Sequence, residues 1–232
     1  MINPLRDLDS VREATERLLS AVEALDRERL SGPSRLPGWT RGHVLAHLSR
    51  NADAIVNVLE GRPMYASAGA READIERDAP RPLDVQLADA HDSDARFRSV
   101  ARLPADWNRV VALRNGVTDR AARLPFRRLV EVELHHVDLD IGYELEDLPE
   151  EFTRREIAFL AERFTGARDV PPIALTAASG ETWSTGGTTG SPMRVEGPAP
   201  ALLGWLAGRR DPDASRAALT AGGGTLPALP PL

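Results

Sequence analysis

The sequence predicts an α+β protein in which a four-helix bundle precedes a small C-terminal domain that mixes helices and strands. Two observations support this fold class. Four long stretches in roughly the first 145 residues carry apolar side chains at spacings of three and four, the pattern of amphipathic helices in a bundle. After Leu148-Pro149 the pattern changes to short strand-like segments separated by Gly, Ser and Thr turns. We therefore divide the chain into domains 1–148 and 149–232.

Each bundle helix has its own sequence signals. We expect the four helices at about 10–30, 40–61, 83–101 and 125–142. Ser10 and Glu13 fit a capping box at the start of the first helix, and Thr40 is a plausible N-cap of the second. Pro104 is expected to close the third helix, and Asn115-Gly116 to form a turn after a short extended segment.

The connection 62–82 is long for a bundle and rich in charge. Loops of this length often carry function, and the sequence leaves open whether this one closes over a site.

The C-terminal domain is expected to begin with a helix and continue as strands. Thr153 and Glu156 fit a second capping box, which predicts a helix ending at Gly166. The other expected elements are strands at 173–177, 182–184 and 193–196, a short helix at 199–208 and a loose tail at 221–232.

Composition excludes several classes of function. The chain has 232 residues, 42% of them hydrophobic, and a net charge of −6, so nothing favours nucleic acid or an anionic membrane as a partner. It has no cysteine, so any thiol chemistry must use a thiol that a small molecule supplies. The first residues lack the apolar core of a signal peptide. We expect a cytoplasmic monomer that acts on small molecules.

The most informative stretch is 129–139, in the middle of the fourth helix. Glu131 and His135 are four residues apart, so their side chains stack one turn above the other. His47 lies beside Val44 and Leu48 on the inward face of the second helix. Two histidines and a carboxylate suit a catalytic divalent metal with a coordination position left for water or substrate. Zinc suits these ligands, although iron, nickel or cobalt would too, and the alternative is a core histidine paired with Glu131.

Three further residues are candidates beside this group. Asp138 follows His135 by three residues and could orient it as a metal ligand, or could simply pair with an arginine. Arg209 and Arg210 follow a helix of the second domain, where an arginine could grip a substrate carboxylate with two hydrogen bonds.

Five motifs share one order with a known family. They are 38–48 (GWTRGHVLAHL) followed by 51–52 (NA), 63–65 (PMY), 71–75 (READI), 131–139 (EVELHHVDL) and 207–209 (AGR). Together they resemble the mycothiol-dependent maleylpyruvate isomerases over nearly the whole chain. The first and fourth motifs are shared with the wider superfamily of DinB-like metal-binding bundles, whereas the 63–65 and 207–209 motifs are narrower signals.

This resemblance implies a fold, a cofactor and a site. The fold would be a DinB-like four-helix bundle joined to a small α/β domain like those of sterol-carrier proteins. Zinc would be held by His47, Glu131 and His135, mycothiol would be the thiol cofactor, and Arg209 would be the essential arginine. Arg210 could take that role if the register slips by one residue.

The activity that the resemblance implies is cis–trans isomerisation of maleylpyruvate to fumarylpyruvate in gentisate-type aromatic degradation. A thiolate that adds reversibly to the double bond lowers its bond order and allows rotation. Two alternatives stay open. One is a mycothiol S-transferase that uses the same three metal ligands, and the other is a non-catalytic binding module in which the histidines are merely packed.

Overall fold

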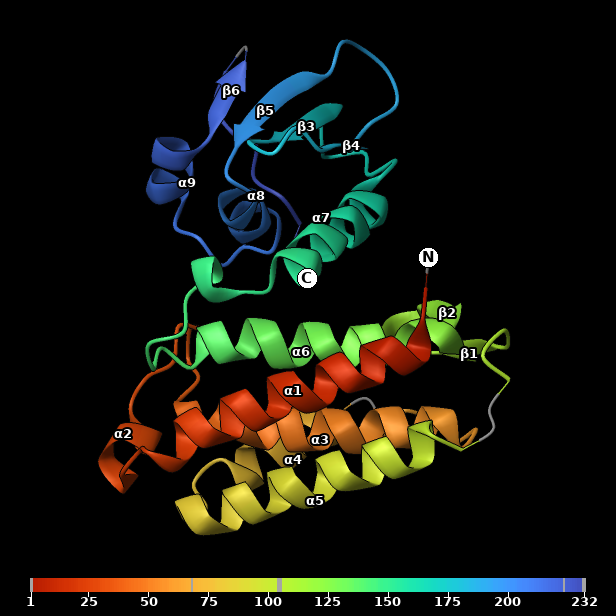
Figure 1. Ribbon diagram of the computed structural model, residues 1–232, viewed down its shortest axis with the longest axis vertical. Coiled ribbons are helices and arrows are strands. Elements are labelled where there is room, and N and C mark those ends of the chain that lie inside the picture. Colours follow the sequence, from red (N-terminus) through yellow and green to blue (C-terminus); the bar gives the residue numbers. More distant parts are fainter. Residues whose placement is uncertain (1, 68, 104–105, 223, 231–232) are drawn as a thin grey trace. The chain divides into compact units, whose positions relative to one another are not determined.

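The computed structural model describes residues 2–67, 69–103, 106–222 and 224–230, so Pro104 and part of the expected C-terminal tail lie outside the described residues. The chain divides into two compact units, Met1–Tyr143 and Glu144–Leu232, each of which is described by itself. The first unit is helical and the second carries a mixed sheet, so the expected α+β fold class is confirmed (Figure 1).

The first unit is built on four long helices. They are α1 (Pro4–Glu23), α3 (Arg41–Leu59), α5 (Leu83–Ala101) and α6 (Leu124–Asp138). Helix α3 packs against α5 and α6, and α1 packs against the same two helices, which closes the ring of a four-helix bundle (Figure 1). The apolar stripe of each helix is buried inside, for example Val11 and Leu18 of α1 and Phe97 of α5.

Shorter elements connect these helices. They are α2 (Arg27–Ser31), α4 (Ala70–Asp78), β1 (Val110–Ala112) and β2 (Thr118–Arg120). Strands β1 and β2 form the expected antiparallel excursion, with Asn115 at φ 59° and Gly116 at φ 73° in the turn between them. The connection 62–82 is not a plain loop, because α4 occupies its second half and packs against α3.

Both expected capping boxes are wrong, although both helices exist. Helix α1 begins at Pro4, whose missing N–H costs nothing at a first helical position, and the Asn3 side chain accepts a hydrogen bond from the Arg6 amide at 3.2 Å. Ser10 therefore lies inside the helix. Thr153 and Glu156 likewise lie inside α7 (Glu150–Phe164), which begins directly after Pro149.

Helix α3 starts where Thr40 predicts it. The Thr40 hydroxyl accepts a hydrogen bond from the His43 amide at 3.3 Å, and the Thr40 amide donates to His43 Nδ1 at 3.2 Å. The next residue, Arg41, reaches the C-terminal end of α6, where its Nε donates a hydrogen bond to the Leu139 carbonyl at 2.7 Å. This contact ties the start of α3 to the end of α6.

A second tie joins the same two helices further along. Arg128 of α6 is buried and donates from Nη1 to the Leu48 carbonyl at 2.8 Å and to the Asn51 side-chain oxygen at 2.9 Å. Burial lowers the pKa of the Arg128 guanidinium, and the Asp94 carboxylate opposes that shift. The two ties together fix which residues of α3 face which residues of α6.

We expect Arg128→Ala to lower the free energy of unfolding by about 3 kcal/mol or more, because it leaves a cavity and unpaired polar groups between α3 and α6. The exposed ion pair of Arg96 with Asp53 offers the matched control, and Arg96→Ala should cost less than about 1 kcal/mol. Urea unfolding followed by circular dichroism measures both. Equal losses in the two variants would contradict the assigned role of Arg128.

The second unit places two helices beside a four-stranded mixed sheet in the order β4-β3-β5-β6. The strands are β3 (Ile173–Ala177), β4 (Thr182–Thr185), β5 (Met193–Gly197) and β6 (Thr220–Gly222). Strand β3 pairs antiparallel with β4 and parallel with β5, and β5 pairs antiparallel with β6. Helix α8 (Ala199–Leu206) packs against α7 and contacts β3 and β5.

Two elements of this unit were not expected from the sequence. Helix α9 (Pro212–Ala218) begins at Asp211, whose carboxylate accepts hydrogen bonds from the Asp213 and Ala214 amides. Strand β6 takes up the first residues of the expected loose tail. In the part of the chain that the structure describes, no helix is both long and apolar enough to pass through a bilayer.

Candidate metal site

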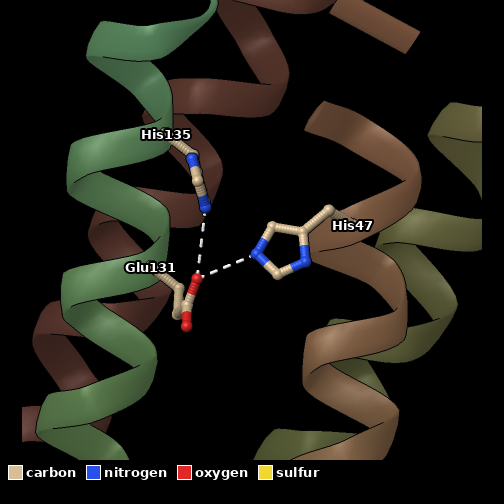
Figure 2. A group of neighbouring side chains, drawn as sticks. All are labelled: His47, Glu131 and His135. Atoms are coloured by element: carbon tan, nitrogen blue, oxygen red, sulfur yellow. Dashed lines mark hydrogen bonds and ion pairs between the residues drawn. The ribbon is translucent and has the colours of Figure 1, made fainter. Parts of the chain in front are cut away.

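The three predicted ligands meet between α3 and α6. Glu131 and His135 project from successive turns of α6, and His47 projects toward them from α3 (Figure 2). One oxygen of Glu131, Oε2, lies 2.9 Å from His47 Nε2 and 3.2 Å from His135 Nε2. All three candidate ligand atoms lie within 4.8 Å of one another, so the group could hold a metal ion.

Burial and charge distinguish the three side chains. Both histidines are buried, whereas the side chain of Glu131 keeps 33% of its surface exposed. Burial lowers the pKa of His47 to about 4, so its imidazole is neutral at pH 7. Burial pushes the pKa of Glu131 upward, but hydrogen bonds from His135 and His47 outweigh it and hold that pKa well below its usual range. The site therefore offers an ionised carboxylate beside a neutral imidazole.

Asp138 holds the His135 ring in place. Its Oδ2 lies 2.7 Å from His135 Nδ1, and the Asp138 side chain is almost fully buried. Burial lowers the pKa of His135, but its hydrogen bond to Asp138, and then that to Glu131, raise it above the usual value. Because a carboxylate only accepts, the proton of a metal-bound His135 would sit on Nδ1 and leave the Nε2 lone pair for the metal.

We expect Asp138→Asn to weaken zinc binding about 10-fold or more, since an amide holds the His135 tautomer less firmly than a carboxylate does. Competition with a chromogenic chelator measures the dissociation constant. Asp140→Asn is the control, because that aspartate pairs with Arg35 at the surface after α6. An unchanged constant for Asp138→Asn would remove the orienting role.

Two residues that the sequence gave no role line the same place. The Trp39 ring lies 5.6 Å from the His47 ring, centroid to centroid. Arg71 of α4 lies with one guanidinium nitrogen 3.2 Å from His47 Nδ1. The sequence signal for Arg71 was its place in the 71–75 motif, which identified a family likeness but no contact.

The other histidines stand apart from this group. His43 completes the N-terminal cap of α3, and its Nε2 lies 3.5 Å from Glu76. His136 stacks on Tyr143 with ring centroids 4.0 Å apart. His91 is exposed.

The candidate arginines lie in the second unit, after α8. Arg209 Nη1 donates to the Ala207 carbonyl at 2.9 Å. Arg210 is paired with Glu146, and its Cβ and Nε lie close to Gly204. Arg210 is thus engaged with a carboxylate of its own unit. That Arg209 acts at the metal remains a prediction.

The residues present fit a divalent ion with one reservation. Two imidazoles and a carboxylate are a ligand set that zinc accepts, and three protein ligands leave a coordination position for a small molecule. The Asp138 contact gives His135 the tautomer that a ligand needs. The Arg71 contact gives a neutral His47 the opposite tautomer.

The first unit is a helix bundle with a His-Glu-His group, and the second is a small unit with a mixed sheet. The chain is therefore a candidate metalloprotein built of two units. Two family models cover most of the chain: the mycothiol maleylpyruvate isomerase N-terminal domain matches residues 11–140, and the MDMPI C-terminal domain matches residues 147–231. The chain belongs to the mycothiol maleylpyruvate isomerase family.

Solved structures agree with this assignment. The chain is similar to the crystal structure of the mycothiol-dependent maleylpyruvate isomerase, with 25% sequence identity and a TM-score of 0.88. The match covers 99% of this chain and 97% of the other. The crystal structure of a histidine-to-alanine mutant of the mycothiol-dependent maleylpyruvate isomerase also matches, with 24% sequence identity and a TM-score of 0.87 over the same shares of both chains. At this identity the second match supports the fold alone. No curated protein sequence gives a significant match.

Proposed function

We propose that this protein is a zinc-dependent cis–trans isomerase that converts maleylpyruvate to fumarylpyruvate with mycothiol as its thiol cofactor, in gentisate-type aromatic degradation. It would work as a cytoplasmic monomer on small molecules, without nucleic acid or membrane. The observation that carries the proposal is the convergence of three ligand atoms within 4.8 Å in a chain of this family.

The chemistry follows from what the site would hold. When bound, zinc and mycothiol together supply a thiolate at neutral pH, whose reversible addition to the double bond permits rotation. His47, Glu131 and His135 would hold the ion, and Asp138 would keep Nε2 of His135 directed at it. Arg209 would bind a substrate carboxylate or stabilise negative charge as it develops on the substrate.

The composition of the chain supports a thiol that a small-molecule cofactor supplies. The protein has no cysteine, so it supplies no thiolate of its own. The substrate is a dianion and the protein carries a net charge of −6, so local positive charge from the metal and nearby arginines must attract it.

The test is the rate of maleylpyruvate conversion by purified protein with mycothiol, before and after metal removal by a chelator. We expect conversion that needs both zinc and mycothiol, with mycothiol returned unchanged. Mass spectrometry of the products separates the isomerase from an S-transferase, since only the latter leaves a stable mycothiol adduct. Full activity after complete zinc removal would contradict the proposal.

A further inference from the structure

Arg71 lies against the outer edge of the candidate metal site. It projects from α4, and its Nη2 lies 3.2 Å from His47 Nδ1. Figure 2 shows that one ring nitrogen of His47 faces Glu131 and the other faces away from it. The guanidinium carbon lies 5.7 Å from the centroid of the Trp39 ring, and the side chain keeps 18% of its surface exposed. Arg71 is therefore held in one place by an aromatic face and an imidazole.

The contact with His47 fixes the position of a proton. A guanidinium only donates hydrogen bonds, so His47 Nδ1 must offer its lone pair to Arg71. The neutral ring then carries its proton on Nε2 and donates it to Glu131 Oε2 at 2.9 Å. A metal at this site needs the Nε2 lone pair, which moves the proton to Nδ1 and sets it against the N–H of Arg71. The Arg71 contact and a metal-bound His47 are thus incompatible.

Besides His47, Arg71 interacts with the side chains of Tyr65, through a hydrogen bond, and of Glu72. Among the described residues, the carboxylate recorded within ion-pair distance of Arg71 is Glu72, at 3.4 Å. The same Glu72 oxygen lies closer to Arg114, at 2.6 Å, so it is already neutralised. Two cations share one carboxylate here, and the fork of Arg71 is suited to a second carboxylate, bound through two parallel hydrogen bonds.

We propose that Arg71 can pair with either of two partners, His47 Nδ1 or a carboxylate of the ligand, and that a metal on His47 Nε2 turns Arg71 to the carboxylate. This inference rests on the proposed function and adds to it a second carboxylate-binding arginine, from the bundle itself. It assigns the 71–75 motif a physical role and makes metal loading and carboxylate binding favour each other. Arg71 would bind the anion. Its hydrogen bond to His47 would also oppose the shift of the His47 proton from Nε2 to Nδ1 that metal binding requires.

The sign of the effect on zinc affinity separates this role from a structural one. We expect Arg71→Ala to bind zinc about fivefold more tightly than the wild type, because the hydrogen bond that metal loading must break is gone. Arg71→Gln should also bind more tightly, since an amide oxygen can accept from Nδ1–H. Arg71→Lys keeps a cation that only donates and should stay near the wild type. Arg62→Ala, at an exposed arginine paired with Asn57, is the matched control and should change nothing.

Carboxylate binding by Arg71 is tested with maleate as the probe and its uncharged diamide as the reference. Calorimetry on zinc-loaded protein should show maleate binding that weakens about tenfold in Arg71→Ala, with no effect on the diamide. Wild-type protein without zinc should bind maleate more weakly than the loaded form.

The outcomes are distinguishable. If the wild type binds zinc but Arg71→Ala and Arg71→Gln bind it equally or less tightly, this inference is overturned and the metal site stands. If zinc affinity rises but maleate binding is unchanged in both variants, the carboxylate role is overturned. If the wild type binds no zinc at all, the proposed function fails and this inference fails with it.

Discussion

Glu131→Gln is expected to weaken zinc binding by at least about 100-fold and to lower the isomerase rate at limiting zinc by a similar factor. Glu131 Oε2 is the atom that both histidines approach, at 2.9 and 3.2 Å, and it supplies the negative charge of the ligand set. An amide keeps the shape but removes that charge, and losing a ligand costs at least as much as losing an orienting partner. Chelator competition measures the affinity, and a continuous assay with mycothiol measures the rate.

Excess zinc provides the internal check for this variant. If Glu131 acts through the metal, activity should return in part as the zinc concentration rises. Glu16→Gln, at an exposed glutamate of α1 paired with Arg12, should leave both affinity and rate unchanged. Zinc affinity equal to that of the wild type in Glu131→Gln would exclude this carboxylate as a ligand.

Arg209→Ala is expected to lower kcat/KM about 100-fold while leaving zinc affinity unchanged. The expected loss is that of one charged donor aimed at charge that develops in the transition state. The structure places Arg209 in the second unit and the three ligands in the first, so the metal site should be indifferent to this change. Steady-state kinetics and chelator competition on the same preparation measure both quantities.

Neighbouring arginines make the Arg209 test specific. Arg210→Ala should cost less activity, because Arg210 is already paired with Glu146, and its loss should appear mainly as lower stability of the second unit. Arg216→Ala, at an exposed arginine of α9 paired with Asp213, should be neutral. A larger loss of kcat/KM for Arg210→Ala than for Arg209→Ala would transfer the role to Arg210.

The grouping of His47, Glu131 and His135 was predictable because helical geometry turns sequence spacing into direction. Glu131 and His135 are four residues apart on one helix, and His47 sits among apolar neighbours on another, so both helices had to present them to the core. The role of Asp138 could be narrowed only to orienting His135 or pairing with an arginine, because spacing does not say which groups a carboxylate meets. The 2.7 Å contact with His135 Nδ1 favours the first alternative.

Arg71 and Trp39 were beyond the reach of spacing arguments. The chain holds 29 arginines and no lysine, and most arginines are solvated, so nothing local distinguishes the one that folds back onto His47. The position of Arg71 depends on helix α4, which could not be predicted from the sequence. The range Ala70–Asp78 is mostly charged and carries one large buried apolar residue, Ile75. A helix that contributes so little to the core leaves no clear periodic signal.

The fold class was easier to predict than the ends of its elements. The range 83–101 and the strand 173–177 match the structure, because apolar periodicity and flanking prolines agree there. The capping boxes at Ser10 and Thr153 misled, since Ser or Thr followed by Glu three residues later also occurs inside helices. Helix α9 and strand β6 are short and built largely of small residues, so pattern alone does not reveal them.

The most direct test of the account is the metal content of freshly purified protein, measured by inductively coupled plasma mass spectrometry on the wild type and on His47→Ala. The account predicts close to one zinc per wild-type chain and almost none in the variant, with both proteins folded by circular dichroism. A folded wild-type protein that carries no zinc, and takes up none from a stoichiometric addition, would contradict it.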